Sequence, residues 1–97
     1  MAATTSREVH ILSYFSLPTD LAASLQDWPE FQGGNEYSVD LSDSREKVAV
    51  RLVEPTDESP YVSVAGQGSG RLFDQVLGFV IHSLAAHSDN LMVDRVS

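Results

Sequence analysis

The chain has 97 residues, enough for one domain with a two-layer core and too few for separate catalytic and cofactor domains. It contains no cysteine, which excludes disulfides, thiolate catalysis and thiolate metal sites. Fourteen acidic residues against six basic ones give a net charge of −8, which argues against nucleic acid and anionic membranes as partners. We expect residues 1–6 to be a disordered lead-in and residues 7–97 a single cytoplasmic domain, because no targeting or membrane-spanning segment is recognisable.

The first expected elements are a strand and a short helix. Residues 8–15 are rich in β-branched and aromatic side chains, with apolar residues on both alternating sets, which is typical of an interior strand. Between residues 17 and 28, Leu21, Leu25 and Trp28 recur at helical spacing. Pro29 then disfavours the helical conformation of the residue before it, so the helix ends there.

Two strands in the middle of the chain are expected to form a hairpin. Apolar and polar residues alternate in residues 37–41 and again in 48–52, on either side of a Ser-Asp-Ser turn. One face of this hairpin is therefore buried and the other wet. We expect acids of the first strand, Glu36 or Asp40, to pair across the wet face with Lys47 or Arg51.

The remaining elements follow from loop signals and periodicity. Residues 33–35 and 54–60 carry the glycines, prolines and acids of loops. A third strand at 61–65, a helix over 70–87 and a last strand at 91–96 complete the chain. The order β-α-β-β-β-α-β predicts an α+β two-layer sandwich, in which a largely antiparallel sheet of about five strands carries both helices on one face.

The helix at 70–87 is unusually apolar. Eight of its side chains are large and hydrophobic, which leaves only a narrow polar stripe. A helix on the outside of a two-layer domain is normally wet on one side, so this breadth predicts extra cover. Loops and the first helix are the favoured source, and self-association through the 70–87 helix is the alternative.

A glycine run at residues 66–70 (GQGSG) stands between a strand and a helix, the context of a phosphate-binding loop. Its spacing is GxGxG and arginine and leucine follow it, so it matches neither the dinucleotide motif nor the P-loop. An anion or carboxylate held by the free amides at the helix start remains an alternative function, with Gly66, Gly68, Ser69, Gly70 and Arg71 as its residues. The competing interpretation is a tight reversal in which glycines supply positive φ and Ser69 caps the helix.

The three histidines do not form a metal-binding pattern. His82 and His87 are five positions apart, about 140° around a helix, so they do not share a face. A site made of His87, Asp89 and His10 would require these residues to come together in the fold, and their spacing gives no support for that. No nucleophile elbow or other catalytic motif is present. We therefore predict no metal site, no cofactor and no enzymatic activity.

These features favour a small, acidic, non-enzymatic protein-interaction module, such as an adaptor, an immunity-like inhibitor or a secretion-chaperone-like protein, acting alone or as a homodimer. The acidic balance predicts a basic protein partner. The aromatic residues are interpreted first as core and second as contact anchors, and the acids form one patch only if their loops lie side by side. The predicted contact residues are Trp28, Phe31, Asp40, Asp43, Glu54, Asp57 and Glu58.

Overall fold

The computed structural model of the protein describes residues 6–12, 19–35, 37–57, 60–68, 70–86 and 91–96. Eight elements follow one another within them: β1 (Ser6–Leu12), α1 (Thr19–Gln26), β2 (Phe31–Gly34), β3 (Ser38–Ser42), β4 (Glu46–Val53), β5 (Tyr61–Gly68), α2 (Leu72–Ala85) and β6 (Met92–Arg95).

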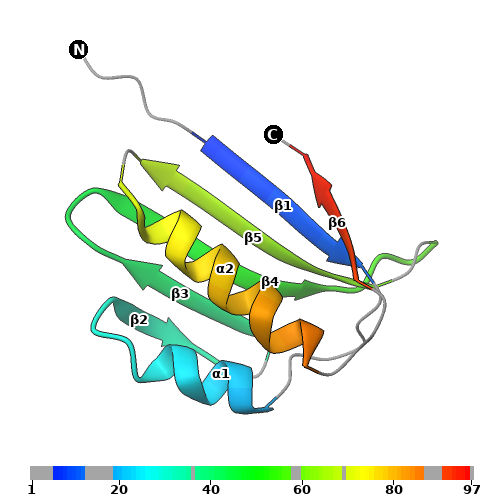
Figure 1. Ribbon diagram of the computed structural model, residues 1–97, viewed down its shortest axis with the longest axis horizontal. Helices are drawn as coiled ribbons and strands as arrows, with labels where there is room; N and C mark the ends of the chain where they lie inside the picture. The colour runs from blue at the N-terminus through cyan, green and yellow to red at the C-terminus, as the bar shows by residue number, and fades with distance from the viewer. Residues whose placement is uncertain are drawn as a thin grey trace.

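The strands form one six-stranded sheet in the order β2-β3-β4-β5-β1-β6, and every neighbouring pair is antiparallel. Both helices lie on the same side of this sheet, with α2 across β4 and β5 and α1 beside β2 and β3 (Figure 1). The expected α+β sandwich with two helices on one face is therefore confirmed. The first strand is an interior strand, as its composition predicts, with β5 on one side and β6 on the other.

Alternation along the strands decides which side chains meet the helices. In β4, Val48 and Val50 are buried, whereas Lys47 before them and Arg51 after them are exposed and Ala49 between them is half-buried. The same two-residue period in the other central strands sends one apolar set toward α1 and α2. The core contains Val9, Ile11, Leu21, Leu25, Val39, Leu41, Val48, Val50, Val62, Val64, Leu72, Phe73, Val76, Val80 and Leu84.

The apolar breadth of α2 is accounted for within the fold. Five of its residues are fully buried, and the flanking Leu77, Phe79 and Ile81 are half-buried against the core. Trp28, just after α1, packs the edge of its ring against Phe79 with centroids 5.5 Å apart. Cover from the region of the first helix is thus confirmed, and self-association through α2 stays a prediction.

One strand, β2, was not predicted from the sequence. Phe31–Gly34 (β2) pairs with β3, so the segment expected to be a glycine loop and an aromatic contact loop is an edge strand with an irregular register between Phe31 and Gly33. The loop proper is short: the side-chain oxygen of Asn35 accepts hydrogen bonds from the backbone N–H groups of Tyr37 and Ser38. The sheet therefore has six strands where about five were expected.

Candidate functional site

The glycine segment is built around a buried acid. Glu46, at the start of β4, is 3% exposed, and its carboxylate accepts hydrogen bonds from the backbone N–H groups of Leu72 (2.8 Å) and Phe73 (3.2 Å). Arg7 approaches the same carboxylate at 3.3 Å and lies over the ring of Phe73. A buried carboxylate needs this kind of compensation, because desolvation of its charge is costly. Glu46 therefore caps α2 from a distant strand.

The glycines fit the chain around this cap. A Cβ on Gly66 would stand 2.5 Å from the Phe73 ring, and one on Gly70 would stand 2.8 Å from the Glu46 carboxylate. Gly68 has φ of +128° and lies against the backbone of Arg45. Two of the expected loop glycines, Gly66 and Gly68, belong to β5, and only Gly68 has the positive φ that was expected of the run.

These contacts change the interpretation of the anion-binding alternative. The amides at the start of α2 that would hold an external anion already donate to Glu46. Arg71 is the N-cap residue and makes no side-chain capping hydrogen bond, and Ser69 lies outside the described residues. An anion at this helix end would have to displace an internal carboxylate that is also paired with Arg7, so we do not retain this site.

The two aromatic residues predicted as contact anchors are packed, not projecting. Trp28 and Phe31 are half-buried and lie against the core cluster. Phe31 belongs to β2, where it pairs with Leu41. The core interpretation of both side chains is confirmed, and their role as contact anchors stays a prediction.

The predicted acidic residues do not form one patch. Asp43 lies in the turn before β4, where its carboxylate accepts hydrogen bonds from the backbone N–H groups of Arg45 and Glu46. Glu54 and Asp57 follow the other end of β4, which is eight residues long, so roughly 25 Å separates the two groups at about 3.3 Å per residue. Asp40 is the member of the set on the uncovered sheet face, where it pairs with Arg51 at 3.6 Å as predicted. Glu58 lies outside the described residues.

The face of the sheet opposite the helices carries its own ordered set of side chains. The strand register places them in rows, because directly paired residues point to the same side. The rows across β3, β4, β5 and β1 are Ser42, Lys47, Gln67 and Ser6; then Asp40, Ala49, Ala65 and Glu8; then Ser38, Arg51, Ser63 and His10.

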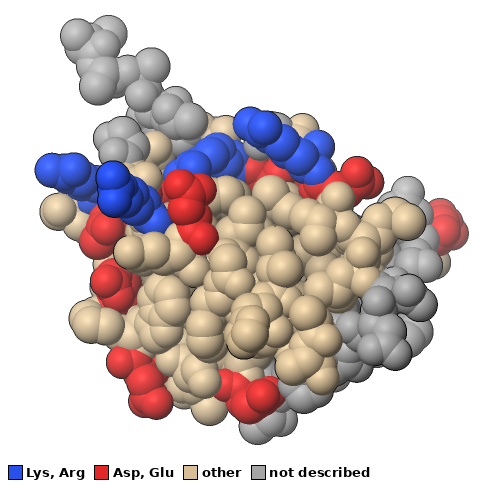
Figure 2. All heavy atoms as spheres, viewed as in Figure 1, with Lys and Arg blue, Asp and Glu red and all other residues tan. Residues whose placement is uncertain are grey.

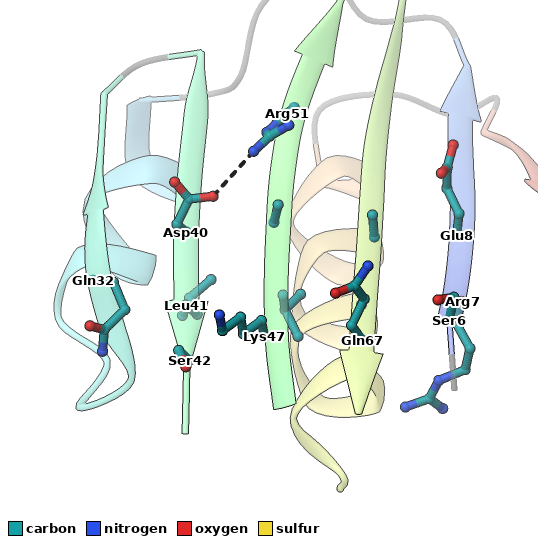
Figure 3. A pocket seen from close by; sticks show the side chains of 14 residues that line it. Ser6, Arg7, Glu8, Gln32, Asp40, Leu41, Ser42, Lys47, Arg51 and Gln67 are labelled. Atoms are coloured by element: carbon teal, nitrogen blue, oxygen red, sulfur yellow. Dashed lines mark ion pairs between the residues drawn. The ribbon is translucent and has the colours of Figure 1, made fainter. Parts of the chain in front are cut away.

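A groove of about 670 Å³ runs along this uncovered face. The facing methyl groups of Ala49 and Ala65 are short enough to leave its centre low, and longer polar side chains, including Gln32, Lys47 and Gln67, stand around them (Figure 3). We call this hollow the sheet groove. Sequence reasoning expected a wet face on the β3-β4 hairpin but missed the groove, whose signal was the pair of small residues at matching positions of two strands.

One constellation in the third row resembles catalytic machinery in composition only. His10 contacts the Glu8 carboxylate through Nε2 and stacks on Tyr61 with ring centroids 4.1 Å apart. Ser63 is the register partner of His10, yet no hydrogen bond connects these two described side chains. A serine nucleophile needs a base in hydrogen-bond contact and donors for the oxyanion, so this arrangement supports no acyl transfer as it stands.

Within the described ranges, no three His, Asp or Glu residues come together as a metal would require, whereas His87 and Asp89 lie outside those ranges. Neither described helix combines the length and apolar content that a membrane crossing needs. Comparison with protein-family models, with curated proteins and with solved structures finds no match to the chain.

Proposed function

We propose that the chain is a non-enzymatic protein-interaction module of the cytoplasm and that the sheet groove is its contact surface. The observation that carries this proposal is the asymmetry of the sheet: one face is sealed by two helices, and the other holds a groove of about 670 Å³. A layered domain normally buries apolar sheet faces, so a sheet face built from small and polar residues is compatible with water and available to a partner.

The shape of the groove favours a protein over a compact ligand. It is lined by residues of five strands, β1 to β5, and is open along its length. Its centre is two alanines, and none of the described residues that line it is a buried polar one. Small-molecule sites are usually more enclosed and more apolar. A low centre with a polar surround lets an extended segment approach the sheet while its side chains meet the surrounding donors and acceptors.

Photocrosslinking from two matched positions tests the proposal. Gln67 stands on the groove face and Gln75 on the exposed side of α2, and both side chains are exposed. Each is replaced in turn by a photoreactive phenylalanine analogue, and each variant is irradiated in extract of the source cells. We expect a protein adduct from position 67 that is absent from position 75.

The mass of the adduct separates the possible partners. A product of twice the chain mass would identify a second copy, and any other discrete mass a different protein. Adducts from position 75 alone, or none from either position in variants that melt like the wild type, would contradict the groove as the contact surface.

A further inference from the structure

The scarce basic residues are not spread over the molecule. Four of the six, Arg7, Arg45, Lys47 and Arg71, come from β1, the β3-β4 turn, β4 and the start of α2, which meet at one end of the sheet. On the helix face, Lys and Arg lie along one edge of the molecule with some acids beside them, and only acids lie along the rest of the rim (Figure 2). We call this region the cationic end.

Three of these four cations form no ion pair with a described residue. Arg7 is held by Glu46 and Asp74, whereas no ion pair within 4 Å engages Arg45, Lys47 or Arg71 among the described residues. Three acids lie at the same end: Asp43 in the turn, Glu46 at the start of β4 and Asp74 beside Arg7. Their hydrogen bonds to backbone amides leave the carboxylate charges in place, so four cations stand against three acids and the cationic end has a local net charge of +1 in a chain whose net charge is −8.

Lys47 connects the cationic end to the sheet groove. It stands in the first row of the groove beside Gln67, and both residues also line a smaller hollow of about 300 Å³ together with Arg45 and Asp43. The two groove acids, by contrast, have partners on the same face, since Glu8 contacts His10 and Asp40 pairs with Arg51. At the Lys47 end, the exposed cations Lys47 and Arg45 outnumber the exposed acid Asp43, so the charge there is net positive.

We infer that the partner segment in the sheet groove is acidic and that its carboxylates lie against Lys47 and Arg45. The inference rests on the proposed function and reverses the polarity expected from net charge. Exposed charges act over about a Debye length, close to 8 Å at physiological ionic strength, so a segment at the cationic end meets mainly the local cations. The other acids of the chain would repel the carboxylates of the partner segment, which favours binding with those carboxylates at the cationic end.

Fluorescence anisotropy with short synthetic peptides tests this inference. The probes are three labelled peptides of equal length, alternating Glu with Ser, Lys with Ser and Gln with Ser. We expect the Glu peptide to bind most tightly, and raising the salt from about 0.1 M to about 1 M to abolish its binding, because the screening length falls from about 10 Å to about 3 Å.

A charge-matched pair of variants locates the site. Lys47→Glu and Arg95→Glu change the net charge by the same amount, but Arg95 lies on the edge strand β6 and lines neither hollow. We expect Lys47→Glu to weaken the Glu peptide about tenfold and Arg95→Glu less than about twofold. Equal losses, or tighter binding of the Lys peptide by the wild type, would overturn the inference.

The outcomes separate this inference from the proposed function. If the protein adduct from position 67 forms equally well with Lys47→Glu, the groove is a contact surface and the acidic polarity is wrong. If the Glu peptide depends on Lys47 but position 67 yields no protein adduct, the charge preference is right and the interaction module is wrong. Matching melting temperatures of the variants exclude misfolding as the cause of either result.

Discussion

The two faces of the sheet carry opposite kinds of side chain on the same strands. Toward the helices, β4 presents Val48 and Val50, which are almost fully buried; toward the groove it presents Lys47, Ala49 and Arg51. Burial of the first set away from water stabilises the fold, whereas the second set remains at the surface, where a partner could contact it. Folding stability and the proposed binding therefore depend on alternate residues, and we expect that each can be changed with little effect on the other.

The largest expected effect comes from removing core volume on the covered face. Leu41→Ala should lower the free energy of unfolding by about 3 kcal/mol, because it deletes buried methyl groups and leaves a cavity. Ser42→Ala, the next residue on the opposite face, should cost less than about 0.5 kcal/mol. Urea denaturation of both variants measures the contrast. Similar losses would mean that the stability of the fold depends equally on both faces of the sheet.

The second effect concerns the buried acid that connects β4 to α2. Glu46→Gln should cost about 2 kcal/mol, since the amide keeps one acceptor but loses the charge that pairs with Arg7 and forces an N–H group toward the helix amides. Asp74→Asn changes the other partner of Arg7, whose side chain is 67% exposed, and should cost less than about 0.5 kcal/mol. Equal costs in urea denaturation would show that Glu46 does not cap α2.

The third effect tests the close contact at Gly66. Gly66→Ala places a methyl group 2.5 Å from the Phe73 ring and should cost about 1–3 kcal/mol. The cost should shrink when Phe73 is leucine, because the smaller side chain leaves room for the methyl group. A double-mutant cycle measures this coupling, and strictly additive losses would exclude the contact as the cause.

The smallest effect has the opposite sign. Gly78 is on the exposed side of α2, and a Cβ there would meet no described atom within 4 Å apart from its chain neighbours and the nearby backbone of α2 itself. Gly78→Ala should therefore raise the free energy of unfolding by about 0.5–1 kcal/mol through helix propensity, as a shift in the urea midpoint. Destabilisation would indicate a neighbour at this position, with self-association through α2 as the first explanation to examine.

Local patterns predicted most of the architecture. Periodicity separated helices from strands, and alternation in the hairpin correctly predicted a wet face with the pair Asp40–Arg51 on it. The strand β2 was missed because four residues with two glycines have no strand signal of their own, and their conformation comes from pairing with β3. A strand of this kind is defined by its neighbour and not by its composition.

The candidate site depended on long-range contacts that one sequence does not reveal. Glu46 reaches amides 26 and 27 positions away, so nothing near it marks it as a helix cap. Lys47 and Gln67 become neighbours only through the β4-β5 register, and the cationic end gathers residues from four segments. The prediction of a basic partner, which stays untested, rests on net charge alone, and net charge averages over ends of the molecule that the fold separates.

Acetylation of Lys47 tests the central claim most directly, because Lys47 is the single lysine of the sequence. Isotope-labelled protein is acetylated alone and in extract of the source cells, together with an added lysine peptide as internal reference, and the ratio of modification of Lys47 to that of the reference is read by mass spectrometry. We predict that the extract slows acetylation of Lys47 severalfold relative to the reference peptide. An unchanged ratio in extract that yields the crosslinked adduct would contradict a partner seated at the Lys47 end of the sheet groove.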